Sequence, residues 1–291
     1  MKKYEFTGEE RDGLKRIRRV SDGLVGGWVE SEENLSHVGD CFISGSAEVS
    51  GNAVVSGNAV VSGSAEVSGN AVVSGSAEVF GNAEVFGNAV VFGSAEVFGN
   101  AEVFGSAEVF GSARVSGSAR VSGNARVSGS ARVSGHARVS GSAEVFGNAV
   151  VFGSAEVFGS ARVFNNAEVF NNARVSGNAR VFNNARVSGN AVVFGSAEVF
   201  GSARVFNNAR VFNNARVSGS AVVSGSAEVL EVGDYWNISG LEYSVTYIRN
   251  NNQLRIGCSS KTPQEWMEQD YSDDEHLNIV QLLLRIFKLT S

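Results

Sequence analysis

Residues 49–67 read VSGNAVVSGNAVVSGSAEV, and the six-residue pattern within them decides the fold. The pattern is Val-(Ser/Phe)-(Gly/Asn)-(Asn/Ser)-Ala-(Glu/Val/Arg), and it runs from residue 43 to residue 229 without an insertion or a deletion, over 31 hexads. A six-residue unit cannot bury its own apolar side chains, so it must stack on copies of itself. We therefore expect an all-β solenoid.

The composition is that of a regular, turn-rich protein. The chain has 291 residues, of which 35 are Gly, one is Pro and 43% are hydrophobic. Because the glycines recur every sixth residue and Pro is nearly absent, a collagen triple helix is excluded. The formal net charge of −6 gives no support to nucleic-acid binding.

No segment of the sequence has the pattern of a membrane span or a secretory signal. The basic N-terminal residues are not followed by an apolar stretch, and nowhere do 18 apolar residues run together. Cys41 and Cys258 lie far apart without the spacing of a metal site, so we expect two reduced thiols. We expect a protein of the cytoplasm of the producing or infected cell, with no membrane contact; association with a virion stays open.

The hexad predicts a coil with three sides. Ala and Val flank the variable residue, so strand geometry sends Ala and Val to one face and the variable residue to the other. The other three residues are rich in Gly and Asn, which adopt positive φ most readily, and they form the corners. Three sides make a prism narrow enough for Ala and Val to fill. We expect a triangular parallel β-helix of about ten 18-residue coils.

The hexads resemble the hexapeptide repeats of left-handed parallel β-helix proteins, and this resemblance implies a left-handed coil. The flanking segments 26–36, 254–258 and 262–266 resemble those of phage and prophage proteins with "GNARV" repeats. That second resemblance implies a phage or prophage origin.

The chain divides into three parts: residues 1–42 form an N-terminal β cap, 43–230 the β-helix, and 231–291 a small C-terminal α+β module. Caps are expected because an open coil end exposes unpaired backbone groups.

In the N-terminal cap, residues 3–6 and 14–20 are predicted as strands on either side of a turn at residues 8–13. Trp28 is predicted to be an apolar plug.

The C-terminal module combines a hairpin with two helices. Residues 243–248 and 254–258 read as the hairpin, and Thr262 and Ser272 each begin a capping box that starts a helix. The second helix carries much apolar surface, including Leu283 and Phe287. We expect these side chains either to pack on the cap or to form a self-association surface, so a protein partner or a second copy is the expected partner.

The outward residue is Glu at 12 positions, Arg at 12 and Val at 7, in bands. The acidic band includes a column of like charges, Glu48, Glu66, Glu84 and Glu102. The next band, the Arg girdle, comprises Arg114, Arg120, Arg126, Arg132 and Arg138. Stacking at 18 residues places Glu96, Glu102 and Glu108 under Arg114, Arg120 and Arg126, in exposed pairs worth at most about 1 kcal/mol each. The girdle could grip phosphates, but solvated charge and pairing between coils is the interpretation we favour, so we expect no nucleic-acid partner.

Phe occupies many corners and predicts aromatic ladders along the rod. The first coil with three Phe corners carries Phe80, Phe86 and Phe92. Stacked one coil apart, such rings are partly buried against one another, and any contiguous exposed rings would form an interaction surface.

The sequence offers little that could carry chemistry. Many hexapeptide-repeat β-helix proteins are acyltransferases that use a histidine base and coenzyme A, but here no loop is inserted between coils and only His136 lies within them. His37 and His276 lack neighbouring metal ligands at suitable spacing. We expect no enzyme activity, no cofactor and no metal.

The expected function is a non-enzymatic structural and interaction rod, with coils as a rigid spacer or display surface and the C-terminal module as the binding element. Two alternatives remain: a hexapeptide-class acyltransferase with His136 or His37 as base, and a viral inhibitor that presents its charged bands to a host protein or nucleic acid.

Overall fold

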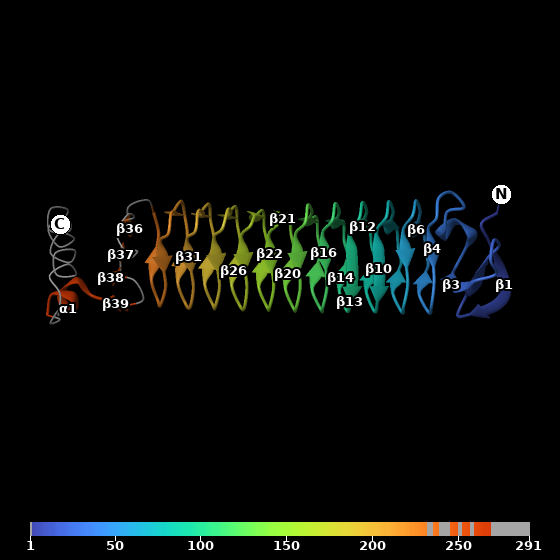
Figure 1. Cartoon of the computed structure of the whole chain (residues 1–291), viewed down its shortest axis with the longest axis horizontal. Helices are drawn as coiled ribbons and strands as arrows, with labels where there is room; N and C mark the ends of the chain where they lie inside the picture. The colour runs from blue at the N-terminus through green and yellow to red at the C-terminus, as the bar shows by residue number, and fades with distance from the viewer. Residues whose placement is uncertain (1, 232–234, 239–244, 250–251, 257–258, 269–291) are drawn as a thin grey trace.

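The structure, a computed structural model, describes residues 2–231, 235–238, 245–249, 252–256 and 259–268. The hexads wind into a row of stacked coils, with the N-terminal strands at one end and the C-terminal strands at the other (Figure 1). The sequence prediction of an all-β parallel solenoid is confirmed.

Three parallel sheets form the three sides of the rod, and each strand pairs with strands one coil, or 18 residues, away. Face 1 carries β5 (Glu48–Val49), β8 (Glu66–Val67), β11 (Glu84–Val85), β14 (Glu102–Val103), β17 (Arg120–Val121), β20 (Arg138–Val139), β23 (Glu156–Val157), β26 (Arg174–Val175), β29 (Val192–Val193), β32 (Arg210–Val211) and β35 (Glu228–Val229). Face 2 carries β6 (Val54–Val55), β9 (Val72–Val73), β12 (Val90–Val91), β15 (Glu108–Val109), β18 (Arg126–Val127), β21 (Glu144–Gly147), β24 (Arg162–Asn165), β27 (Arg180–Val181), β30 (Glu198–Val199) and β33 (Arg216–Val217). Face 3 carries β4 (Phe42–Ile43), β7 (Val60–Val61), β10 (Glu78–Gly81), β13 (Glu96–Gly99), β16 (Arg114–Val115), β19 (Arg132–Val133), β22 (Val150–Val151), β25 (Glu168–Val169), β28 (Arg186–Val187), β31 (Arg204–Val205) and β34 (Val222–Val223).

Most of these strands have two residues rather than the three that the hexad predicts. The Ala of the hexad belongs to the corner at many positions, because its N–H donates to the carbonyl oxygen three residues earlier, as Ala53 does to Ser50 at 3.3 Å. The corner backbones also bond from coil to coil, as Ser94 N–H does to Gly111 at 2.7 Å. The coils are therefore joined at both strands and corners.

The core is the double column of Ala and Val on each side. Every Ala and every inward Val of the hexads is fully buried, while the outward residue between them is not. Each buried Val contributes roughly 1.5 kcal/mol through the area it removes from water. The interior is thus apolar and uniform along the whole rod.

The corners depend on positive φ at one position of each hexad. Gly51 has φ of 63° there, and Asn165 takes the same conformation at 61°. Asn is tolerated because its short polar side chain enters the left-handed region more readily than other side chains. Its amide also bonds along the rod, since Asn165 Nδ2 donates to Asn183 Oδ1 at 3.0 Å.

The N-terminal cap is a three-stranded antiparallel extension of face 1, formed by β1 (Tyr4–Arg11), β2 (Leu14–Arg19) and β3 (Val25–Val29). The predicted turn at residues 8–13 is wrong, because β1 continues to Arg11 and only Asp12 and Gly13 lie between the strands. A register shift between Phe6 and Glu10 accommodates Gly8, whose φ is 92°, so Gly8 marks a bulge instead of a turn.

Trp28 is not the plug that the sequence predicts. It pairs with Glu48 in the outward register, and the guanidinium groups of Arg11 and Arg16 lie over its ring at 4.6 and 5.4 Å. Its neighbour Val29 points inward instead and is fully buried. Trp28 is itself buried, but it lies outside the core cluster, which at this end includes Tyr4, Ile17, Val29 and Leu35.

The coil register begins before the hexad pattern does. Val29 pairs with Val49 on face 1 and Leu35 bridges to Val55 on face 2, so both occupy inward positions below the first hexads. The 3-10 helix η1 (Glu32–Asn34) connects them. Cys41 is fully buried nearby, with its Sγ 3.0 Å from Lys3 Nζ.

The C-terminal end carries an antiparallel sheet of β36 (Tyr235–Ile238), β37 (Val245–Ile248), β38 (Gln253–Ile256) and β39 (Ser259–Lys261). The predicted hairpin is confirmed as β37 and β38, while β36 and β39 were not predicted. The helix α1 (Pro263–Met267) begins at Thr262 with the predicted capping box. The predicted second helix, Leu283, Phe287 and Cys258 lie outside the described residues.

This sheet contacts the last coils. Thr246 Oγ1 accepts a hydrogen bond from Val222 N–H at 3.2 Å, and Arg255 donates to Ser224 Oγ at 2.9 Å. Val245, Ile248 and Leu254 are buried. The C-terminal sheet therefore packs against the end of the rod, beside β34.

Candidate functional site

The acidic column lies on face 1, as the 18-residue register predicts. Glu48 pairs with Glu66, Glu66 with Glu84 and Glu84 with Glu102 in successive strands. The column ends on arginines at both sides: Arg11 of the N-terminal cap forms an ion pair with Glu48, and Arg120 lies 2.8 Å from Glu102. Only the middle of the column, at Glu66 and Glu84, has no ion pair within the described chain.

The Arg girdle is mostly engaged with carboxylates of the neighbouring coils. Arg114, Arg120 and Arg126 lie 2.8, 2.8 and 3.1 Å from the Glu residues predicted for them. Arg138 is 3.9 Å from Glu156, and Arg132 makes no ion pair with any residue that the structure describes. Because these pairs are exposed, each contributes at most about 1 kcal/mol to stability. They fix register and leave Arg132 as the unpaired charge of the girdle.

The predicted aromatic ladders are present. Phe80 stacks on Phe98, Phe86 on Phe104 and Phe92 on Phe110, with ring centroids 4.9 to 5.0 Å apart and interplanar angles of 5° or less. These corner rings are half-buried. The ladders thus present ring edges to solvent and cover ring faces with one another.

The longest ladder lies on face 2, where Phe146, Phe164, Phe182 and Phe200 stack in one row. Arginines of the same face lie between successive rings: the guanidinium of Arg162 is 5.2 Å from the Phe146 centroid and 5.8 Å from that of Phe164. Arg180 repeats this contact with Phe164 and Phe182 at 5.5 and 5.3 Å. Aromatic and cationic side chains therefore form one joint surface.

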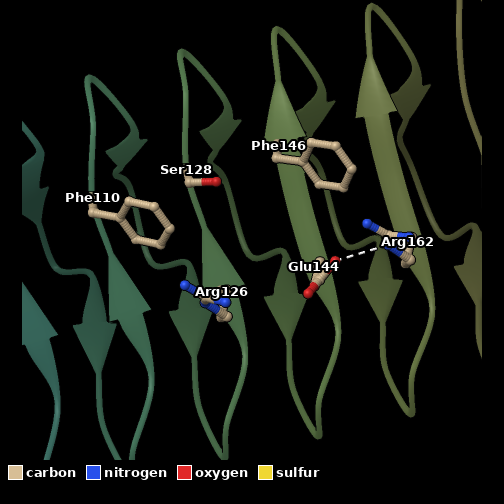
Figure 2. Close-up of a pocket in the computed structure, with 6 residues that line it drawn as sticks. All are labelled: Phe110, Arg126, Ser128, Glu144, Phe146 and Arg162. Carbon is tan, nitrogen blue, oxygen red and sulfur yellow. Dashed lines mark hydrogen bonds and ion pairs between the residues drawn. The ribbon is translucent and has the colours of Figure 1, made fainter.

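One missing ring interrupts this face. Ser128 stands at the corner between Phe110 and Phe146, and Figure 2 shows its small side chain between the two rings. The gap is a pocket of about 200 Å³ lined by Phe110, Arg126, Ser128, Glu144, Phe146 and Arg162. Arg126 forms an ion pair with Glu108 at 3.1 Å, and Arg162 forms one with Glu144 at 2.8 Å.

This pocket is not among the sites predicted from the sequence. The signal was available, because the corner residues at 18-residue spacing read Phe92, Phe110, Ser128, Phe146 and Phe164. A single Ser within such a series predicts a gap one ring wide.

The two described histidines occupy different settings. His136 is exposed at a corner, and its ring makes no hydrogen bond with any described residue. His37 is part of the N-terminal cap: its ring stacks on Tyr4 at 4.4 Å, Nδ1 accepts a hydrogen bond from Lys3 N–H, and Nε2 lies 2.9 Å from Glu32 Oε1. Burial raises the pKa of the Tyr4 hydroxyl well above its ordinary value, and the Glu32 carboxylate raises it further.

Neither a metal centre nor a membrane-spanning helix occurs in the described residues. No three or more His, Cys, Asp or Glu side chains gather there as a metal site would require. Likewise, none of the described helices combines the length and the apolar character needed to cross a bilayer.

Six segments of the chain match the model of a family described as YdcK beta solenoid repeat, and all lie within the hexads: residues 47–63, 119–135, 131–145, 173–188, 185–201 and 209–225. Together with the three parallel sheets, these matches show that the chain is a repeat β-helix protein. No curated protein matched it.

Proposed function

We propose that the chain is a non-enzymatic rod that holds two dissimilar ends apart and displays ordered bands of side chains between them. The observation that carries this proposal is the unbroken stacking of the three sheets around a core of Ala and Val. Because the core of the coils is apolar, their functional groups lie on the outer surface. The number of uniform coils sets the distance between the two ends and their relative orientation.

The two ends support a role in joining. Each carries antiparallel strands whose sequence differs from the hexads and whose side chains contact the terminal coil, as Arg11 contacts Glu48 and Thr246 contacts Val222. We propose that the C-terminal module binds a protein partner or a second copy of the chain, and that the rod works in the cytoplasm. A phage or prophage origin is part of the proposal and rests on the resemblance of the flanking segments.

Removal of whole coils tests the rod. Deletion of residues 112–147 takes out 36 residues, or two coils, and joins Gly111 to Asn148 within an intact hexad. We expect the shortened chain to fold and its maximum dimension in small-angle scattering to fall by about 10 Å, since strands stack at about 4.8 Å.

The matched control is deletion of residues 112–144, which removes less of the chain but breaks the hexad, and it should prevent folding of the coils around the junction. If the chain that lacks residues 112–147 does not fold, or if its maximum dimension is unchanged, the proposal of a rod built from independent coils is contradicted. The full-length chain and the chain that lacks residues 112–147 are then used to capture host proteins. Because this deletion removes the whole Arg girdle, partners of the girdle should bind the full-length chain alone, whereas partners of the ends should bind both.

Calorimetry with acetyl-CoA tests the absence of acyltransferase activity. We expect no heat of binding at millimolar acetyl-CoA. Saturable binding that is lost in His136→Ala would replace the rod with the acyltransferase.

A further inference from the structure

In the ladder of face 2, the two inner rings, Phe164 and Phe182, each have a ring on both sides and an arginine on the strand side. Phe164 has Phe146 and Phe182 as stacking partners at 4.9 Å, and Arg162 and Arg180 lie within 5.8 Å of its centroid. Such stacking and cation–π contacts are favourable when water is excluded from the ring faces.

The Ser128 pocket has the same surroundings without the ring. Phe110 and Phe146 stand two coils apart, so their separation is about twice the 4.9 Å between successive rings on either side. Arg126 lies 5.2 Å from the Phe110 centroid, as Arg162 does from Phe146, but at its own corner it has Ser128 in place of a second ring. Figure 2 shows the two rings projecting from corresponding corners with the gap between them.

We infer that the Ser128 pocket binds one planar, electron-rich aromatic ring, which inserts between Phe110 and Phe146 and completes the ladder. The ring stacks on both phenyl groups with an offset that leaves part of its face to the Arg126 guanidinium, as the Arg162 guanidinium lies over the ring of Phe164. An indole or phenol fits this description better than an aliphatic group, because only a flat ring fills a gap one ring thick and attracts a cation.

The polar lining suits a ring with a hydrogen-bonding edge. Arg126 uses Nε to donate to Glu108, and its two Nη groups make no hydrogen bond within the described chain. Glu144 accepts from Arg162 through Oε2 only, so Oε1 can accept a hydrogen bond. An indole N–H or a phenol O–H can therefore find a partner beside the pocket.

A gap one ring wide also occurs at two other corners, where Val192 and Arg204 take the place of Glu144. Ser176 on face 1 stands between Phe158 and Phe194, and Ser188 on face 3 stands between Phe170 and Phe206. In each case an arginine two residues earlier pairs with the Glu one coil below: Arg174 with Glu156 at 2.9 Å and Arg186 with Glu168 at 3.1 Å. Each face thus has one single-ring gap with a paired arginine, and we expect these two gaps to bind the same class of ring.

The test uses the full chain with Ser176→Phe and Ser188→Phe as the parent, so that only the Ser128 pocket stays open. Phe fits these corners because the hexads already carry it at equivalent positions. Binding of 5-fluoroindole is followed by ¹⁹F NMR. We expect saturable binding by the parent and at least a tenfold weaker affinity after Ser128→Phe, which fills the pocket.

Two further variants distinguish binding in the Ser128 pocket from nonspecific binding of the probe to exposed phenyl rings. Ser74→Phe adds a ring below Phe92 on the same face without changing the pocket, and it should leave binding unchanged. Ser134→Phe adds a ring on face 3 and creates a new single gap at Ser116, between Phe98 and the added ring. That variant should bind about twice as much probe at the same subsaturating concentration.

Equal binding by the Ser128→Phe and Ser74→Phe chains would overturn the inference, as would the absence of saturable binding in all of them. A second probe, N-acetyl-5-fluorotryptophanamide, distinguishes two sources of the ring. Binding of both probes at the Ser128 pocket points to an aromatic side chain of a polypeptide, and binding of 5-fluoroindole alone points to a free aromatic molecule.

Discussion

The side-chain amide of Asn34 donates a hydrogen bond to the backbone carbonyl of Ala53 at 2.9 Å, from a position that is only 1% exposed. The same Nδ2 also donates to Gly51 at 2.9 Å, and Oδ1 accepts from Ser31 N–H at 2.8 Å. The Asn34 side chain thus provides the hydrogen-bond donors that the backbone of a preceding coil would otherwise provide to the carbonyl oxygens of Gly51 and Ala53. Asn34 therefore closes one corner of the N-terminal end of the rod.

Asn34→Ala should destabilise this end by about 2 to 4 kcal/mol, because it leaves buried backbone groups without partners. Amide hydrogen exchange should speed up in the first coils, around Ala53, more than in coils further along. The matched change is Asn52→Ala, which removes an exposed amide whose one hydrogen-bond partner among the described residues is Asn70. Equal effects of the two substitutions would show that Asn34 does not close this corner of the end.

The two valines of β9 differ only in the direction of their side chains. Val73 is fully buried, whereas Val72 occupies the outward position and is partly exposed. We expect Val73→Ala to cost about 2 kcal/mol through lost burial and a cavity, and Val72→Ala to cost under about 1 kcal/mol. Chemical denaturation of both variants measures this difference, and a larger effect at Val72 would contradict the assignment of inward and outward faces.

Asn183 combines a positive φ of 62° with a hydrogen bond from Asn165 at 3.0 Å. Asn183→Gly should change stability by less than about 1 kcal/mol, because Gly adopts this conformation freely. Asn183→Val should cost about 1 to 3 kcal/mol, since a β-branched residue is strained there. Asn184→Val, one residue on and outside the positive-φ region, serves as the control and should be milder in a thermal melt.

The capping box of α1 predicts a pH dependence at the C-terminal module. The Glu265 carboxylate accepts a hydrogen bond from Thr262 N–H at 2.7 Å, and this bond, with that from the Thr262 hydroxyl, lowers the pKa of Glu265 from its ordinary 4.5. A lowered folded pKa means that the contribution to stability is complete above 4.5 and is lost as the pH falls through the folded value.

Side-chain carboxyl NMR of Glu265 should show the lowered pKa, and Thr262→Ala should move it only part of the way back, since the backbone N–H remains. A Glu265 titration at or above 4.5 in the unaltered chain would show that the capping box does not form in solution.

Residue spacing was enough to predict most of the rod. The hexad gave the three sides, the 18-residue register and hence the pairs such as Glu96 with Arg114, because each of these follows from repeating one local conformation. The gap at Ser128 follows from the same register, although it becomes a binding pocket only when the flanking rings and Arg126 are placed around it.

The ends were less predictable because their contacts join residues that no period relates. Trp28 reads as a plug in isolation, but pairing with Glu48 turns it outward, under Arg11 and Arg16. Likewise, Tyr4 donates hydrogen bonds from its hydroxyl to Glu32 and Leu35, and Asn34 reaches Ala53.

The sequence by itself therefore determined the coil, because a strict six-residue repeat allows one conformation to be copied along the chain. Only the tertiary structure decided how the coil ends are closed, because closing them depends on single contacts between segments that share no repeat.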